Sequence, residues 1–161
     1  MMTTLALRQA MLEDAPLMTE LILTAFEDHR GKIVPPSGAH NETPDKVRAK
    51  LEQGGGIIAT VDGTSAGCVV YYPEEAEQMY LGRLAVLPAF RKHGVGQALV
   101  AAVEETALAM GFLRMSLAVR VALPGNRAFF ERLGYSVTGY ESHAGYTEPT
   151  FMHLVKPLGK S

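Results

Sequence analysis

The chain has 161 residues, of which 47% are hydrophobic and 20% are charged, and a formal net charge of −2. These values are typical of one globular domain, expected to span residues 1–161, and they exclude a disordered or low-complexity chain. The one cysteine, Cys68, excludes an intrachain disulfide, and the scattered histidines give no metal site. With neither an export signal nor an apolar run of membrane-spanning length, the sequence predicts a cytoplasmic protein without a metal or a membrane partner.

Two helix starts and one hairpin turn organise the first half of the chain. Asp14 before Pro16, and Thr43 before Pro44, are typical of helix N-termini. The pair Asp62-Gly63 between two apolar runs is typical of a tight hairpin turn. The predicted elements are a strand at residues 5–9, a helix from 14 to 29, a loop at 31–42, a helix from 43 to 53, hairpin strands at 56–61 and 66–72, and a third meander strand at 78–86.

The second half begins with the longest periodic segment. Apolar residues recur every three or four positions from Val95 to Met110, and Gly111 closes the run, as expected for a helix. The other predicted elements are a strand at 113–121, a helix at 125–133 and strands at 135–141 and 150–156. This order predicts an α/β fold with a mixed central sheet of six to seven strands and about four helices. Strands 78–86 and 113–121 should lie parallel, because one helix connects them.

The net charge is divided unevenly along the chain. Residues 1–77 carry 12 acidic and 6 basic residues, net −6; residues 78–130 carry 2 and 6, net +4; residues 131–161 carry 3 of each. The basic middle segment favours a bound anion, with an unevenly charged solvated surface as the alternative. We expect no nucleic-acid partner, because phosphate neutralisation needs a basic face that is not offset elsewhere.

A basic loop with two glycines precedes the longest predicted helix. It reads Arg91-Lys92-His93-Gly94-Val95-Gly96. A helix N-terminus offers unpaired amides and the positive end of the helix dipole, which together bind phosphate-like anions. We expect Gly94 and Gly96 to allow positive φ and close approach of a ligand, with a simple tight turn as the alternative. A dinucleotide-binding fingerprint is disfavoured, because its third small residue would fall at Leu99.

The same loop matches the pattern Arg/Gln-x-x-Gly-x-Gly/Ala and resembles the pyrophosphate loop of the GCN5-related N-acetyltransferase (GNAT) superfamily. The apolar strand ending at Val86-Leu87-Pro88, and the block from Asn126 to Tyr135, are similar to that family in order and spacing. The resemblance implies the acyl-CoA N-acyltransferase fold, with a sheet splayed after the strand at 78–86 and the pantetheine arm of acetyl-CoA inserted there. It implies an acetyl-CoA-dependent N-acetyltransferase, in which an amine attacks directly within a ternary complex.

The resemblance also implies roles for individual residues. Backbone groups of Leu84 and Val86 would bind the pantetheine arm, and Asn126 and Phe130 would contact the cofactor. A helix cap is the alternative for Asn126, and a core position is the alternative for Phe130. The pyrophosphate would be held by backbone amides and two positive charges of the basic loop and helix start: Arg91, Lys92, His93, Gly94, Val95, Gly96 and Gln97.

The catalytic residues depart from the family pattern. The common block has a tyrosine, the acid for the leaving thiolate, where this chain has Phe130. Tyr135, Tyr140 and Tyr146 remain as candidates for the acid, with His143 nearby as a possible base, and among them we name Tyr146 as the acid. Glu77, the carboxylate closest to the splayed strand, is named as the base that deprotonates the amine, with a solvated acidic turn as its alternative.

Two functions are compatible with the sequence. One is acetyl transfer to a primary amine of a small molecule or peptide; the other is a non-catalytic acyl-CoA-binding or regulatory module on the same scaffold. The net charge of −6 over residues 1–77 favours a cationic amine or basic peptide as acceptor. The sequence leaves open a homodimer.

Overall fold

One mixed sheet of seven strands runs through the molecule, in the order β1-β2-β3-β4-β5-β7-β6. The computed structural model describes residues 3–159, so the ends of the domain expected at 1–161 lie outside the described residues. The strands are β1 (Leu5–Gln9), β2 (Gly55–Val61), β3 (Thr64–Glu75), β4 (Gln78–Val86), β5 (Arg114–Arg120), β6 (Ser136–Glu141) and β7 (Phe151–Pro157). As predicted, β4 and β5 are parallel, and the other neighbouring pairs of this sheet are antiparallel.

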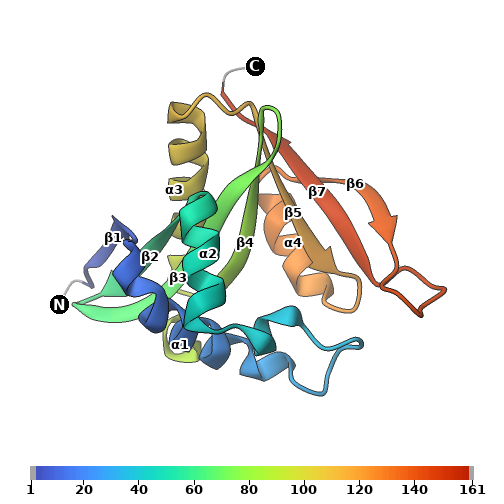
Figure 1. Ribbon diagram of the computed structural model, residues 1–161, viewed down its shortest axis with the longest axis horizontal. Coiled ribbons are helices and arrows are strands. Elements are labelled where there is room, and N and C mark those ends of the chain that lie inside the picture. The colour runs from blue at the N-terminus through green and yellow to red at the C-terminus, as the bar shows by residue number, and fades with distance from the viewer. Residues whose placement is uncertain (1–2, 160–161) are drawn as a thin grey trace.

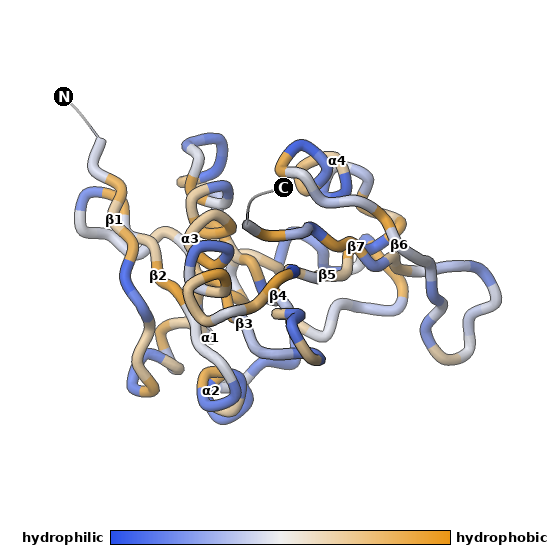
Figure 2. The backbone as a smooth tube through the Cα atoms, turned by 90° about the horizontal axis from the view of Figure 1, so that it is seen from above, coloured by the Kyte–Doolittle hydropathy of each residue, from blue (hydrophilic) through white to orange (hydrophobic). Residues whose placement is uncertain are grey.

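Four α-helices of the described chain cover the two faces of the sheet. They are α1 (Ala15–Phe26), α2 (Pro44–Gln53), α3 (Val95–Ala109) and α4 (Pro124–Arg132). Figure 2 shows α1 and α2 on one side of the sheet and α3 and α4 on the other. Within residues 3–159, no helix is both long enough and apolar enough to span a membrane. The cytoplasmic setting stays a prediction.

Both faces of the sheet are buried, which explains the apolar run in β2. Ile57 and Ala59 pack in the core cluster that includes α3, whereas Ile58 packs in the cluster that includes α1 and α2. Side chains alternate between the faces of a strand, so a strand covered on both faces has apolar residues at successive positions. Leu99 and Val103 of α3 are fully buried, as their helical spacing predicted.

The sheet divides between β4 and β5. The two strands pair only through residues 78–80 and 114–116, although β4 continues to Val86 and β5 continues to Arg120. Figure 1 shows the two strands diverging, with the segment at residues 27–43 crossing beneath the opening. Beyond Tyr80, β4 therefore has one edge without a strand partner. This divided sheet confirms the mixed, splayed α/β fold expected from the sequence.

A β-bulge lies in β4 beside this opening. Gly82 and Ala85 pair with β3 residues only two positions apart, so Arg83 and Leu84 stand opposite a single β3 residue. Arg83 adopts φ 50°, in the left-handed region. A bulge bends its strand and redirects a side chain.

The backbone groups of Leu84 and Val86 face the open edge of β4. Leu87 donates its N–H to Ala66 O on β3 at 2.8 Å. Successive residues of an extended strand direct their backbone groups to opposite sides, so Leu84 and Val86 face away from β3. The open edge thus offers hydrogen-bonding groups to an extended ligand.

The start and end of the first helix differ from the prediction. The Asp14 side chain does not cap α1, because its carboxylate accepts bonds from Arg8 and from the Met11 N–H, both at 2.8 Å. The helix ends at Phe26, and a 3-10 turn follows at residues 27–29. Thr43 caps α2 as predicted and accepts a bond from the backbone N–H of residue 46 at 3.2 Å.

The variant Gly67→Ala tests whether the close approach of β3 to β4 requires a glycine at this position. A Cβ at this position would stand 2.4 Å from the Ala85 carbonyl oxygen, a backbone atom that cannot move aside alone. We expect Gly67→Ala to lower the free energy of unfolding by about 1–3 kcal/mol, the usual cost of overpacking. The matched control is Gly139→Ala on β6, where a Cβ meets no atom within 4 Å. Urea denaturation measures both variants, and equal losses would contradict the prediction.

Candidate functional site

The first turn of α3 presents free backbone amides. Gly94 is the N-cap, with φ 78°, and the first helical bond runs from the Ala98 N–H to Gly94 O at 3.0 Å. The N–H groups of residues 95–97 therefore have no acceptor within the helix, and they lie at the positive end of its dipole. This arrangement is suited to an anion.

Only one of the two loop glycines needs a left-handed backbone. Gly94 has a positive φ, whereas Gly96 lies inside α3 and does not. The expectation of positive φ is therefore wrong for Gly96, because the helix begins one residue before it. A Cβ at Gly96 would make an ordinary contact, 3.5 Å from Phe129 Cζ. Gly96, the second residue of α3, therefore leaves the first helical turn without a side chain at that position.

Arg91 anchors the loop to the rest of the fold. Its Nε donates to Val86 O at 3.0 Å, and its Nη2 donates to Ala25 O at 2.9 Å. Its Nη1 pairs with the Asp28 carboxylate, and this hydrogen bond lowers the pKa of Asp28. One guanidinium thus connects the end of β4 to the end of α1.

A cavity of about 920 Å³ lies beside this loop, and we call it the outer cavity. It is bounded by the start of α3, the start of α4 and the open edge of β4. Nine residues expected to bind the cofactor line it: Leu84, Val86, Arg91, Lys92, Gly94, Val95, Gly96, Gln97 and Asn126. The exposed His93 does not line it, and Phe130 lines a different cavity.

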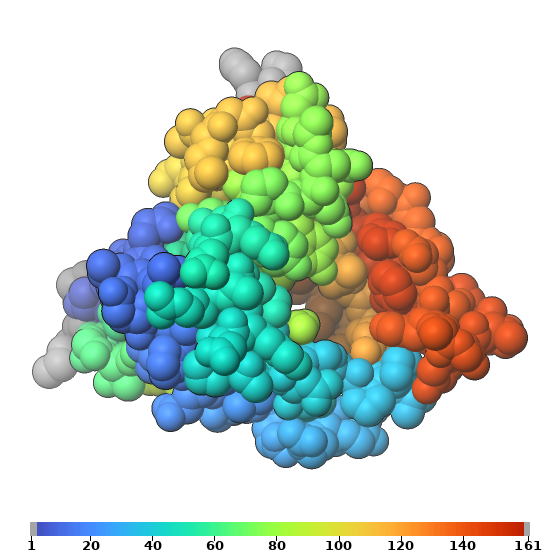
Figure 3. All heavy atoms as spheres, viewed as in Figure 1, coloured from blue at the N-terminus to red at the C-terminus, as the bar shows by residue number. Residues whose placement is uncertain are grey.

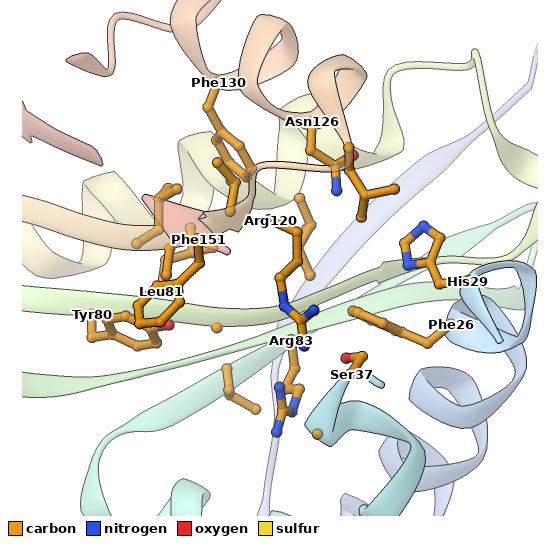
Figure 4. Close-up of a pocket in the computed structure, with 18 of the residues that line it drawn as sticks. Phe26, His29, Ser37, Tyr80, Leu81, Arg83, Arg120, Asn126, Phe130 and Phe151 are labelled. Atoms are coloured by element: carbon orange, nitrogen blue, oxygen red, sulfur yellow. The ribbon is translucent and has the colours of Figure 1, made fainter. Parts of the chain in front are cut away.

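The structure excludes the helix-cap alternative for Asn126, whereas it places Phe130 both in the core and in a cavity wall. The N-cap of α4 is Leu123, so Asn126 is the third residue of the helix and does not cap it. Asn126 instead lines both cavities, and Figure 4 shows its amide directed toward the interior. Phe130 is buried in the core cluster and packs edge-on against Tyr135, yet it also forms part of a cavity wall.

A second cavity, of about 450 Å³, lies in the opening between β4 and β5, and we call it the inner cavity. Figure 3 shows the surface hollowed here, between α2, the segment at residues 27–43 and the β6–β7 segment. Aromatic side chains form much of its wall, among them Phe26, Tyr80, Phe130 and Phe151 (Figure 4). Its volume is in the range of sites for small molecules.

The two cavities meet at β4. Five residues line both of them: Phe26, His29, Leu84, Asn126 and Phe129. His29 is the one titratable group in this set. Burial is the main cause that lowers the pKa of His29 below its ordinary value of 6.5, so the imidazole is neutral near pH 7 and can accept a proton.

A buried carboxylate supports one wall of the inner cavity. The Glu42 side chain is 1% exposed and accepts bonds from Arg83 Nε at 2.5 Å and Lys50 Nζ at 3.0 Å. Burial acts to raise the pKa of Glu42, but the hydrogen bonds from the two cations outweigh it, and the net shift is downward. The Glu42 cluster (Glu42, Lys50 and Arg83) therefore fixes the bulge side chain against α2.

On the opposite wall, Arg120 at the end of β5 holds the segment at residues 27–43. Its Nη1 donates to Pro35 O at 2.7 Å, and its Nη2 donates to Pro36 O at 3.1 Å. The same segment is therefore attached to β5 through Arg120 and to β4 through the Glu42 cluster. These attachments form the floor of the inner cavity.

Neither of the two residues expected to be catalytic lines a cavity. Glu77 lies in the β3–β4 turn, at the paired end of β4 and β5, where its carbonyl accepts the Leu113 N–H at 2.9 Å. Tyr146 lies in the β6–β7 loop and is 40% exposed. The structure thus brings the cofactor residues together but leaves this pair outside them.

The negative net charge of residues 1–77 does not make the inner cavity acidic. The charged side chains that line it are Lys50, Arg83 and Arg120, with His29 and His143, and no described Asp or Glu lines it. The expectation of a cationic acceptor is therefore not supported. A segment's net charge counts every side chain, whereas the cavity is lined by only those few that point inward.

Sequence reasoning missed His29, Arg83 and Arg120 as site residues. Arg83 carried a usable signal, because it is the one charged residue within the apolar strand at 78–86. His29 and Arg120 lie at the ends of a helix and a strand, where polar residues are ordinary. Only the fold brings them to one cavity.

A comparison with family models finds the acetyltransferase (GNAT) family, matched over residues 17–135. The chain belongs to the acetyltransferase (GNAT) family. Membership, together with the divided sheet, identifies it as an enzyme of the GNAT acetyltransferase class. The identity of its acceptor does not follow from membership.

Solved structures share the fold over nearly the whole chain. A GNAT-family acetyltransferase from Desulfovibrio desulfuricans is 22% identical, with 97% of this chain and 100% of that chain covered and a TM-score of 0.78. The ribosomal-protein-S18-alanine N-acetyltransferase of Escherichia coli is 16% identical, with 98% and 96% covered and a TM-score of 0.79. The PaiA N-acetyltransferase of Thermoplasma acidophilum, solved in complex with coenzyme A, is 17% identical, with 96% and 99% covered and a TM-score of 0.78. A comparison with curated proteins finds no match.

The variant Glu42→Gln tests whether the ion pairs of the Glu42 cluster stabilise the fold. We expect Glu42→Gln to lower the free energy of unfolding by about 1–3 kcal/mol, because it leaves two partly buried cations without their carboxylate. The difference from wild type should shrink as the pH falls below 4.5, the ordinary pKa, because the unfolded-state carboxyl is then protonated and folding must release that proton; the difference is lost as the pH reaches the lower folded-state pKa. The control is Glu52→Gln in α2, the helix that carries Lys50; Glu52 is an exposed partner of Arg48 at 3.9 Å. Denaturation at several pH values measures both, and equal losses would contradict the prediction.

Proposed function

We propose that the protein transfers an acetyl group from acetyl-CoA to a primary amine of a small molecule or peptide, by direct attack of the amine in a ternary complex. The observation that carries the proposal is that two cavities meet at the open edge of β4. The outer cavity contains the anion-binding end of α3, and the inner cavity has the size of a small acceptor. A donor and an acceptor can therefore reach the same strand edge from two sides.

The residues of the outer cavity suit acetyl-CoA. The free amides of residues 95–97 and the charge of Lys92 would bind the pyrophosphate. Backbone groups of Leu84 and the N–H of Val86 would bind the pantetheine arm; Val86 O already accepts a bond from Arg91. When bound, acetyl-CoA supplies an activated thioester carbonyl.

His29 is the base in the proposed reaction. An acceptor ammonium has no lone pair, so His29 removes one proton before the nitrogen attacks. The nitrogen forms the new C–N bond as the C–S bond breaks, and the second proton of the nitrogen leaves with the thiolate or to water. A thiol with a free pKa of about 8.5 is a tolerable leaving group, so Phe130 in place of a tyrosine acid does not prevent the reaction.

The alternative is a non-catalytic acyl-CoA-binding module, which Phe130 at the family's acid position favours. Thiol release from acetyl-CoA with a panel of amines separates the two functions. Sustained release supports the transferase. Binding of acetyl-CoA without release on the whole panel supports the module, and no binding contradicts both.

Gly96→Asp tests the phosphate site. The new carboxylate would lie at the second position of α3, where it repels a bound pyrophosphate but interacts favourably with the helix dipole. We expect the melting temperature without ligand to be unchanged or higher, and the stabilisation by acetyl-CoA to be lost. For wild type, ligand at 100 times its Kd should add about 2.7 kcal/mol. Gly96→Ala is the fold control; equal acetyl-CoA stabilisation of the Asp variant and wild type would place the phosphates elsewhere.

His29→Gln tests the base. Because the pKa of His29 is lowered, its basic form is present above that pKa, and activity should fall as the pH drops through a value below 6.5. We expect the variant to lose about 100-fold in kcat and to lose this acidic limb of the profile. His153→Gln on β7, outside both cavities, is the control. An unchanged acidic limb in His29→Gln would assign the base to another group.

A further inference from the structure

The inner cavity has an excess of positive charge at fixed positions. Its cationic lining consists of Lys50, Arg83 and Arg120. Among residues 3–159, Glu42 is the one carboxylate bonded to any of these three, and it serves Lys50 and Arg83 together. Three positive charges and one negative charge leave a net charge of about +2 facing the cavity.

Arg120 has no carboxylate partner in the described part of the chain. Its two terminal nitrogens donate to the carbonyl oxygens of Pro35 and Pro36, which are neutral acceptors. Burial lowers the pKa of Arg120, as expected for a cation partly removed from water without a counterion. An arginine donates up to five hydrogen bonds, so Arg120 retains donors for a ligand.

Arg83 faces the same space from the other strand. It binds Glu42 through Nε alone, so its terminal nitrogens have no carboxylate partner among the described residues. The bulge sets its backbone at φ 50° and directs the side chain into the cavity. Figure 4 shows Arg83 and Arg120 in the central part of the cavity, one from each side of the divided sheet.

The rest of the wall is aromatic and aliphatic. Phe26, Tyr80, Phe130 and Phe151 line it, and so does Leu117. A ligand complementary to these surfaces has one anionic group and one apolar side. A polyamine or a lysine-rich peptide satisfies neither requirement, because its charges would meet like charges.

We propose that the acceptor is a small amine that carries a carboxylate, of the class of apolar and aromatic amino acids, and that Arg83 and Arg120 bind its carboxylate in the inner cavity. This inference rests on the proposed acetyl transfer. The planar guanidinium groups match a carboxylate through paired N–H donors. The two arginines are specificity residues, and the amine of the acceptor reaches the junction of the cavities at His29 and Leu84.

The test compares acceptors that differ only in the anionic group. Phenylalanine, phenylalaninamide and phenethylamine share one side chain, and spermidine represents a cationic acceptor. A comparison of phosphoethanolamine with ethanolamine shows whether the site prefers a phosphate group to a carboxylate. We expect kcat/KM for phenylalanine to exceed that for its amide by at least about tenfold, the equivalent of 1.4 kcal/mol. A preference for the amide, for spermidine or for the phosphoamine would overturn the inference.

Variants separate recognition from folding. Arg120→Gln should raise the KM for phenylalanine at least about tenfold more than the KM for phenylalaninamide, because any loosening of the segment at residues 27–43 affects both acceptors alike, and should leave the stabilisation by acetyl-CoA in place. Arg120→Lys keeps the positive charge but not the planar guanidinium. Its KM for phenylalanine should therefore lie between that of wild type and that of Arg120→Gln. Arg127→Gln on α4 is the matched control, because Arg127 pairs with Glu131 outside both cavities. An equal loss on phenylalanine and its amide would mean that Arg120 only supports the loop, which contradicts the inference.

Binding is measured separately from turnover. Calorimetry with phenylalanine and its amide, in the presence of coenzyme A, reports recognition even when no thiol is released. Binding of phenylalanine that depends on Arg120, without thiol release from acetyl-CoA, supports the inference and contradicts the proposed transferase. Equal turnover on amines with and without a carboxylate supports the transferase and contradicts the inference.

Discussion

The parting of β4 from β5 is the feature on which the rest of this structure depends. Two parallel neighbours in a sheet normally bond along their whole length, yet here they pair over only three residues of each strand. The backbone groups of β4 beyond Tyr80 must then find water or a ligand, because unpaired buried groups are costly. The opening is interior to the sheet, not at its edge, so it is flanked by helices on both faces. Both cavities are consequences of this one interruption.

The bulge and the segment at residues 27–43 turn this opening into two spaces with different chemistry. On the side of α3, the exposed groups are backbone amides. On the side of β5, they are the side chains of Arg83 and Arg120, each of which also holds the segment in place. The contacts that stabilise the cavity floor and the groups that face a ligand therefore belong to the same residues. A chain-wide charge count cannot show this, since the acidic residues of the N-terminal half largely point elsewhere.

The fold was predictable because its signals are local. The spacing of Leu99 and Val103, the Asp62-Gly63 turn and the loop before Val95 each determine structure within a few residues, and all three formed as expected. The inner cavity was not predictable in this way. His29, Arg83 and Arg120 meet only because three distant elements converge, and the direction of Arg83 depends on a bulge that the alternation of β4 does not reveal. Asp14 is a smaller example of a contact that the local sequence did not predict. Its carboxylate accepts a hydrogen bond from Arg8 and so does not cap α1.

The open edge of β4 also bears on how such proteins diverge. Leu84 and Val86 present backbone groups, and every residue except proline has the same N–H and C=O. A binding edge made of main-chain atoms survives replacement of most of its side chains, whereas a site made of arginine side chains changes with a single substitution. This asymmetry accords with a fold shared at TM-scores of 0.78 and 0.79 by chains only 22% and 16% identical. The same interrupted sheet thus combines an edge of main-chain groups, which depends little on residue identity, with a cavity lined by side chains, which depends on it strongly.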